Sequence, residues 1–173
     1  ALQGRYWNGD LLAIFDETAG GVIEELDFRR EAINAKTFGE SIAWLGYARV
    51  PETLPELTTR RALAMEWIEG RHLQGLEPEE AARMTYMAVE AVTAGLCLTG
   101  LVHADPHEGN IMLADDGRLV FLDFGLMSTV DANIMEAFAS GIQCVLSKDY
   151  EGLVRAFIDT GFVGSPIEWR PAE

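Results

Sequence analysis

Cysteine is scarce in this 173-residue chain, which contains only Cys97 and Cys144. Two cysteines are too few for the disulfide framework that stabilises small secreted domains. Both lie within apolar patterns of helical period, so we interpret them as buried thiols rather than as catalytic groups. With 49% hydrophobic and 24% charged residues, the chain is long enough to bury a core as one domain or as two small lobes.

Positive charge is also scarce, because 13 Lys and Arg residues face 28 Asp and Glu residues and the net charge is −15. This balance argues against nucleic acid as a partner, since its phosphates would be repelled. It argues equally against docking on an anionic membrane surface.

Long hydrophobic runs are missing as well. The first residues, ALQGRYW, lack the apolar core and the cleavage-site pattern of a signal peptide. The segment nearest to a membrane span is 86–102, whose one charge is Glu90. It is short for a bilayer and follows Pro78-Glu79-Glu80, a typical helix start, without a basic flank. We therefore predict a buried helix there, and the chain shows no repeat or low-complexity tract.

The segment 101–125, LVHADPHEGNIMLADDGRLVFLDFG, carries acidic and amide side chains at a spacing typical of a phosphoryl-transfer site. Asp105 is followed five residues later by Asn110 and eighteen residues later by Asp123, which opens Asp-Phe-Gly. A nucleoside triphosphate requires Mg²⁺ held by hard oxygen ligands, and Asn110 and Asp123 can supply them. Asp105 is the carboxylate expected to orient an attacking hydroxyl or to accept its proton.

A predicted β-hairpin explains this spacing. Two apolar runs, 111–113 and 119–122, flank the turn residues Asp115-Asp116-Gly117. Asp-Gly between apolar runs predicts a hairpin, which would present Asn110 and Asp123 at one end. Taken singly, these residues are also consistent with ordinary turns. Their order, with the hairpin between them, favours a kinase-like site.

The sequences HADPHEGN at 103–110 and ELDFRREAIN at 25–34 resemble the UbiB-type atypical kinases, also called aarF-domain-containing kinases. The resemblance extends from about residue 10 to about residue 165, and Glu108 departs from it because that family usually has Pro there. It implies a kinase or ATPase that uses ATP and Mg²⁺ and supports quinone or isoprenoid-lipid biosynthesis. The implied partners are lipid precursors and a biosynthetic complex. The implied location is membrane-associated, in the bacterial inner membrane, the mitochondrion or the plastid.

The resemblance also implies site residues: cofactor-binding Glu31, Glu66, Ile68, Asn110 and Asp123, and regulatory or metal-adjacent acids Glu25 and Asp27. Glu31 is the expected partner of a nucleotide-positioning lysine, and 64–70 (AMEWIEG) is the expected strand leading into the hinge between lobes. Asp27 and Glu31 are four residues apart on a predicted helix, so they would share a face and repel by a few tenths of a kcal/mol. A solvated acidic face softened by Arg29 and Arg30 is the alternative interpretation.

The phosphate-covering loop and strand lysine of such kinases are missing ahead of Glu31. The only lysines, Lys36 and Lys148, both follow it, and the Lys-x-Gly-Gln segment typical of the family is absent. Gly20-Gly21 fits a turn before a helix better than a phosphate loop. We therefore expect this chain to be a fragment of a kinase domain that turns over little ATP by itself.

The expected fold is α+β and predominantly helical. It is protein-kinase-like, mostly the larger C-lobe with a truncated N-lobe. We assign 1–70 to a partial N-lobe with the Glu-bearing helix and the hinge strand, and 71–173 to a C-lobe with the catalytic loop and Asp-Phe-Gly. Besides the hairpin at 111–123, periodicity predicts helices at 10–19, 21–47, 78–100, 131–147 and 149–160, and strands at 49–51 and 61–68.

Smaller features of the last two helices are also predicted. Asp131 and Asp149 are the expected N-caps, and Gly161 is the expected end of the last helix. We expect core packing for the apolar stripe formed by Ile134, Phe138, Ile142 and Val145.

Two features of the motif region refine the functional expectation. Pro106 between His103 and His107 disfavours a helix, so we interpret His103 as a structural hydrogen-bonding residue rather than as a metal ligand. Only residues 126–131 separate Asp-Phe-Gly from the next predicted helix, which leaves no room for a peptide-docking activation segment. We therefore expect ATP hydrolysis or action on a small or lipid-like molecule.

Two alternatives to an enzyme of this type remain. One is a non-catalytic nucleotide-binding regulator, a pseudokinase-like scaffold of a lipid-associated complex. The other is an aminoglycoside-type small-molecule kinase, which the wording of residues 103–106 disfavours.

Overall fold

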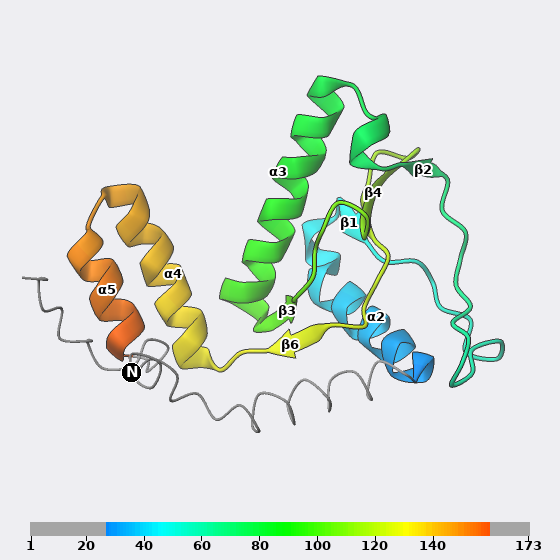
Figure 1. The fold of residues 1–173 in the computed structure, drawn as a ribbon, viewed down its shortest axis with the longest axis horizontal. Coiled ribbons are helices and arrows are strands. Elements are labelled where there is room, and N and C mark those ends of the chain that lie inside the picture. The colour runs from blue at the N-terminus through cyan, green and yellow to red at the C-terminus, as the bar shows by residue number, and fades with distance from the viewer. Residues whose placement is uncertain (1–26, 160–173) are drawn as a thin grey trace, which may run out of the picture.

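A computed structural model describes residues 27–159 as a mixed α+β structure (Figure 1). In chain order the elements are α2 (Phe28–Ile42), the short turn η1 (Ala43–Leu45), β1 (Ala48–Arg49), β2 (Gly70–Arg71), η2 (Leu73–Gly75), α3 (Pro78–Ala94), the π-helical turn η3 (Gly95–Thr99), β3 (Leu101–His103), β4 (Ile111–Ala114), β5 (Leu119–Phe121), β6 (Met127–Thr129), α4 (Ala132–Ser147) and α5 (Tyr150–Asp159). The helix expected at 10–19, and Gly161, lie outside the described residues.

Helix α2 is shorter than the helix expected at 21–47. It begins after Asp27, whose side chain accepts a hydrogen bond from the Arg29 N–H and so satisfies one free donor of the first turn. Residues 21–26 lie outside the described part of the chain. At the other end the helix stops at Ile42, and the η1 turn ends at Gly46, which adopts a left-handed φ of 72°. The left-handed conformation of Gly46 ends the helical segment, although the apolar periodicity of the sequence predicts helix up to residue 47.

Helix α3 confirms the helix start predicted at Pro78. Pro78 occupies the first turn, and the side chains of Glu77 and Glu80 form a capping box. One face of the helix is buried through Met84, Met87, Ala91 and Ala94, whereas Tyr86 and Val89 on the other face are exposed. The predicted burial therefore applies to one face only. None of the helices within residues 27–159 has the length and hydrophobicity needed to cross a bilayer.

The β4–β5 hairpin forms where the sequence predicts it. Its strands pair antiparallel with Ile111 opposite Phe121 and Leu113 opposite Leu119. Gly117 adopts a φ of 83°, and its N–H closes the turn onto the Ala114 carbonyl at 2.8 Å. β1 adds to β5 in parallel and β2 adds to β4 antiparallel, which gives a four-stranded sheet in the order β1-β5-β4-β2.

The prediction of a strand at 61–68 is wrong, because the structure has no strand there. The strand expected at 49–51 forms at Ala48–Arg49. In the 61–68 segment the main chain bonds to the neighbouring 52–54 segment, as in Glu66 N to Glu52 O at 2.8 Å, instead of joining the sheet. The sheet takes Gly70–Arg71 in its place. A Cβ at Gly70 would lie 2.4 Å from the Leu113 carbonyl oxygen, so this pairing depends on glycine.

An aromatic cluster joins α2 to the hairpin and forms the centre of the core. Phe38, Phe121 and Phe124 are fully buried, and the Phe38 ring meets the Phe121 ring edge-on with centroids 5.1 Å apart. The buried His103 ring packs against all three. Burying one such phenylalanine contributes roughly 1.5–3 kcal/mol relative to exposure.

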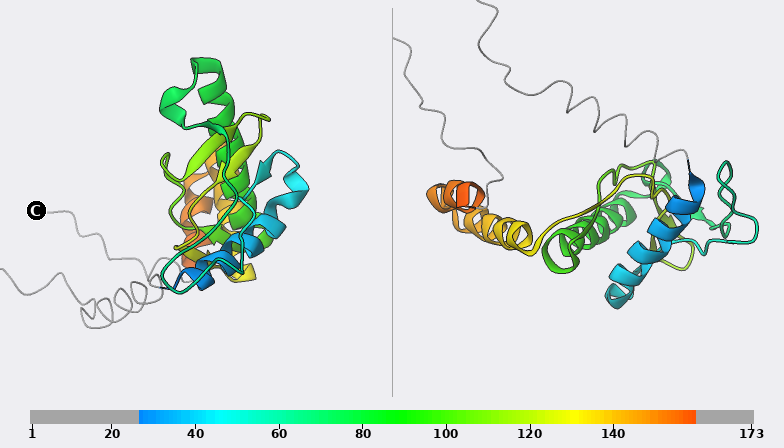
Figure 2. Two further views of the ribbon diagram at one scale, coloured as in Figure 1. Left: turned by 90° about the vertical axis from the view of Figure 1, so that its right-hand side faces the viewer. Right: turned by 90° about the horizontal axis from the view of Figure 1, so that it is seen from below.

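Helices α4 and α5 form a pair beside the C-terminal end of α3, apart from the sheet (Figures 1 and 2). Asp131 and Asp149 directly precede α4 and α5 as predicted, and Asp149 Oδ1 accepts a hydrogen bond from Gly152 N–H at 2.9 Å. The core packing expected for the α4 stripe is only partly correct. Phe138 packs against Phe157, but Ile142 and Val145 are 40% and 52% exposed, in an open groove that they line together with Leu153 and Phe157 of α5.

Candidate functional site

The 103–110 loop runs from the buried end of β3 to the start of β4 and is shaped by its own hydrogen bonds. The N–H of His107 donates to the Asp105 carbonyl and the N–H of Asn110 donates to the His107 carbonyl, both at 2.9 Å. The Asn110 side-chain amide also donates to the Asp105 carbonyl at 3.2 Å. These bonds present the Asp105 carboxylate to solvent, where a reactant can reach it.

Asn110 and Asp123 lie at one end of the hairpin, as the sequence predicts. The register continues past Ile111 and Phe121, because the Leu122 N–H donates to the Asn110 carbonyl at 2.9 Å. Because Asn110 Nδ2 donates to the Asp105 carbonyl, the Oδ1 atom of Asn110 is left to bind a ligand. Asp123 Oδ1 accepts from Gly125 N–H at 2.9 Å, which leaves Oδ2. The end of the hairpin therefore carries two adjacent positions with hard oxygen donors.

This donor set fits Mg²⁺ better than a metal caged by protein alone. Among residues 27–159, no cluster of three or more His, Cys, Asp and Glu side chains is arranged to hold a metal ion. Mg²⁺ commonly binds through one or two protein oxygens and completes its shell with water and phosphate oxygens. Asn110 and Asp123 match that requirement.

Helix α2 holds the Asp-Phe-Gly segment through both main-chain groups of Phe124. Glu31 Oε1 accepts from the Phe124 N–H at 3.3 Å, and Asn34 Nδ2 donates to the Phe124 carbonyl at 3.0 Å. Glu31 is thus adjacent to the predicted metal ligand Asp123, a position consistent with a cofactor-binding role. Asn34 was not predicted as a site residue. Its spacing of three from Glu31 on a helix was the available signal, because such residues share a face.

The expectation that Asp27 and Glu31 share a helix face is wrong. Asp27 precedes the helix as its N-cap, and its carboxylate is paired with the Arg29 guanidinium at 2.6 Å. The hydrogen bond from Arg29 lowers the pKa of Asp27 to about 2. The alternative interpretation, in which a neighbouring arginine neutralises the acidic face, therefore applies to Asp27. A regulatory role of Asp27 stays a prediction. Glu25 lies outside the described residues.

The hinge residues Glu66 and Ile68 have different environments. The Arg49 guanidinium binds the Glu66 carboxylate at 2.8 Å and holds its pKa below the usual range. Ile68 is buried with Met112 and Val120 of the hairpin. The main-chain N–H and C=O of Ile68 make no hydrogen bond within the described part of the chain. Both groups are therefore available to a ligand edge lying against the sheet.

His103 has the structural character expected for it. It is 3% exposed, and its Nδ1 accepts a hydrogen bond from the Asp105 N–H at 3.3 Å. Its Nε2 is buried without a hydrogen-bond partner among residues 27–159. Burial lowers the pKa of His103 because it disfavours the imidazolium ion more than the nearby Asp123 main chain favours it.

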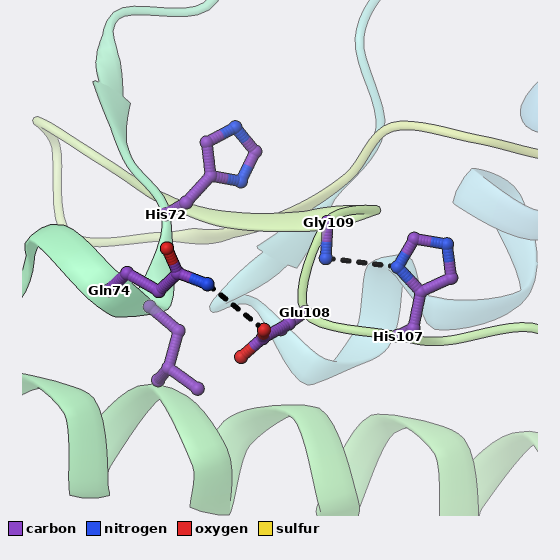
Figure 3. Close-up of a pocket in the computed structure, with 6 residues that line it drawn as sticks. His72, Gln74, His107, Glu108 and Gly109 are labelled. Carbon is purple, nitrogen blue, oxygen red and sulfur yellow. Dashed lines mark hydrogen bonds between the residues drawn. The ribbon is translucent and has the colours of Figure 1, made fainter.

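A cavity of about 420 Å³ separates the η2 turn from the 103–110 loop (Figure 3). Gln74 Nε2 donates to Glu108 Oε1 at 3.1 Å across it, and His72 Nδ1 lies 2.9 Å from the Ile111 carbonyl. The His107 side chain lies on the opposite wall and accepts a hydrogen bond from Gly109 N–H. Sequence patterns gave no signal for this cavity, because its walls are 34 residues apart in the chain.

The connection after Asp-Phe-Gly is as short as predicted. β6 pairs antiparallel with β3, with Met127 opposite His103 and Thr129 opposite Leu101. The chain then enters α4 at Ala132. This pairing ties the connection to the base of the 103–110 loop and leaves no extended segment between them.

Comparison with known proteins gives consistent matches. Residues 3–157 match the ABC1 atypical kinase-like domain. The chain is 35% identical over 159 residues to Protein ACTIVITY OF BC1 COMPLEX KINASE 8, chloroplastic, of Arabidopsis thaliana, which covers 88% of this chain and 21% of that protein. It is 32% identical over 170 residues to the ACTIVITY OF BC1 COMPLEX KINASE 3 protein of the same plant, covering 94% and 24%.

A solved structure is similar over nearly the whole chain. The Rv3197–erythromycin complex from Mycobacterium tuberculosis superposes with a TM-score of 0.68 at 25% identity, covering 96% of this chain and 42% of that one. The kinase-like character of the fold agrees with the matched domain. The chain spans about a quarter of the length of the curated relatives it matches.

Proposed function

The chain belongs to the ABC1 atypical kinase-like family, the aarF or UbiB family, and on that premise we propose that it carries the phosphoryl-transfer site of an Mg-ATP-dependent kinase or ATPase. The observation that carries this proposal is the hairpin end, where Asn110 and Asp123 lie together and the Asn110 amide bonds to Asp105. Two oxygen-donor side chains at the end of a hairpin, beside a loop that carries a solvent-exposed carboxylate, are the parts that phosphoryl transfer needs.

In this proposal each residue has a distinct task. Asn110 and Asp123 hold Mg²⁺, which offsets the negative charge of the nucleotide phosphates. Asp105 orients the attacking hydroxyl or water and takes its proton, a role supported by the exposure of its carboxylate. Glu31 would pair with a nucleotide-positioning lysine, and its bond to the Phe124 N–H would hold that ion pair next to Asp123.

The nucleotide base is proposed to lie against the hinge. The free main-chain groups of Ile68, next to the apolar Met112 and Val120, support an adenine edge at this position. The Glu66 carboxylate is occupied by Arg49, so we assign Glu66 to the nucleotide site through its main chain. The partial N-lobe at 1–70 and the C-lobe at 71–173 remain our proposed division.

The acceptor is proposed to be water, a small molecule or a lipid-like molecule. The short β6 connection supports this, because nothing between Asp123 and α4 resembles a peptide-docking segment. A role in quinone or isoprenoid-lipid biosynthesis, lipid or complex partners and a membrane-associated location follow from the family resemblance alone. The rival class is a nucleotide-binding regulator, which needs Asn110 and Asp123 but not the chemistry of Asp105.

Calorimetry on the complete protein that contains this chain tests the nucleotide site. We expect ATP binding to require Mg²⁺, and Asp123→Asn to weaken it because one metal oxygen is lost. Asp116→Asn is the matched control, since Asp116 lies at the opposite end of the same hairpin and is paired with Arg118. Equal ATP affinity with and without Mg²⁺, or no effect of Asp123→Asn, would overturn the assignment.

A further inference from the structure

The imidazole of His107 is oriented by the loop that carries Asp105 (Figure 3). The Gly109 N–H donates a hydrogen bond to His107 Nδ1 at 3.0 Å. A backbone N–H can only donate, so Nδ1 is the acceptor and the proton of the neutral ring lies on Nε2. Nε2 is 3.7 Å from Asp105 Oδ2. The donor nitrogen of the ring is therefore the one that lies near the Asp105 carboxylate.

The main chain fixes this ring as well. His107 donates its own N–H to the Asp105 carbonyl and accepts at its carbonyl from Asn110 N–H. Gly109 lies directly under the imidazole, because a Cβ there would be 2.9 Å from His107 Cε1 and 3.0 Å from Nδ1. Apart from Gly109 itself and its two chain neighbours, no other heavy atom of residues 27–159 lies within 4 Å of that Cβ position. The close approach of Gly109 to the ring is thus specific to His107.

We propose that His107 is a positioning residue for Asp105, whose Nε2–H directs Asp105 Oδ2 and leaves Oδ1 to receive the proton of the attacking hydroxyl. The inference rests on the proposed function. A neutral N–H orients a carboxylate without the full positive charge that would lower its basicity. The 3.7 Å separation is longer than a hydrogen bond, and such contacts commonly shorten when the reactants bind.

A double-mutant cycle with Asp105 tests whether His107 acts through that residue. In the complete protein, His107→Ala is expected to lower single-turnover ATP consumption roughly tenfold, the scale of a lost orientation. Mg-ATP affinity should stay within about twofold, because His107 bonds neither oxygen assigned to the metal. His107→Gln, which keeps an N–H donor, should recover part of the loss. On the Asp105→Asn background, His107→Ala should cause no further loss. If His107→Ala lowers the turnover of Asp105→Asn by the same factor as it lowers that of the unmodified protein, the proposal is overturned.

Gly109→Ala provides an independent perturbation of the same ring. The new methyl group must displace the imidazole, so turnover should fall as in His107→Ala. When His107 is already alanine, Gly109→Ala should have no further effect, because the clash partner is gone. Gly75→Ala is the matched control, since its Cβ would meet only Arg71 Cβ at an ordinary 3.8 Å. A further loss from Gly109→Ala on the His107→Ala background would contradict the proposal.

The two hypotheses fail in different ways. If the unmodified protein neither binds nor turns over Mg-ATP, the proposed function fails and the positioning role fails with it. If it does both while the cycle is additive, only the role of His107 fails.

Discussion

The side-chain amide of Asn34 donates a hydrogen bond to the main-chain carbonyl of Phe124 at 3.0 Å, across 90 residues of sequence. Glu31, one turn earlier on α2, accepts from the N–H of the same residue. Helix α2 therefore binds both polar main-chain groups of the residue that follows Asp123. The position of the Asp123 carboxylate, which we propose as a metal ligand, therefore depends on α2 through these two hydrogen bonds.

Asn34→Ala should weaken Mg-ATP binding without abolishing folding. The part-buried Phe124 carbonyl loses its donor, which costs about 1–3 kcal/mol. Part of that cost should appear as a several-fold higher Kd for Mg-ATP, measured by calorimetry. Asn133→Ala on the exposed first turn of α4 is the control and should leave Kd unchanged. Equal Kd values for both variants would show that the hydrogen bond from α2 does not support the nucleotide site.

Phe38→Ala should destabilise the fold by about 3–5 kcal/mol, because it opens a cavity among the rings of His103, Phe121 and Phe124. Urea unfolding measures this change. Ile33→Ala, at an exposed position of the same helix, should change the stability by no more than about 0.5 kcal/mol. A loss below about 1 kcal/mol for Phe38→Ala would place the centre of the core elsewhere.

Stability should fall as the pH drops below about 6.5, the ordinary value for histidine. The pKa of His103 is lowered in the fold, so below 6.5 the unfolded chain binds a proton that the folded chain does not. The contribution of neutral His103 to the free energy of unfolding is constant above pH 6.5. As the pH falls from 6.5 toward the pKa of folded His103, this contribution is lost by at most about 1.4 kcal/mol per pH unit. Thermal unfolding of the metal-free protein measures it. An unchanged slope in His103→Gln would assign the pH dependence to other groups.

The hairpin and its flanking site residues were predictable because their determinants are local. Asp116-Gly117 between two apolar runs fixes the turn, and the turn fixes which residues meet at the far end, namely Asn110 and Asp123. The starts of α3 after Glu77 and of α5 after Asp149 follow from capping chemistry in the same way.

The features that sequence patterns missed depend on distant partners. The apolar 61–68 segment has the composition of a strand, yet it pairs with the adjacent 52–54 loop, and Gly70 takes the sheet position because only glycine fits against Leu113. The role of Asn34 depends on a partner 90 residues away, and Val145 is 52% exposed although it belongs to the apolar stripe of α4. Periodicity gives the apolar face of a helix but not the element that covers it.

The most direct test of the account is ATP turnover by Asp105→Asn in the complete protein, measured beside Mg-ATP affinity. The amide keeps the size of the side chain but cannot accept the proton of a nucleophile. We expect affinity within a few-fold of the unmodified protein and turnover lowered by roughly 10²-fold or more. Undiminished turnover would contradict the role of Asp105. Full support of quinone-lipid production by the variant with no measurable turnover would identify the protein as a nucleotide-gated regulator.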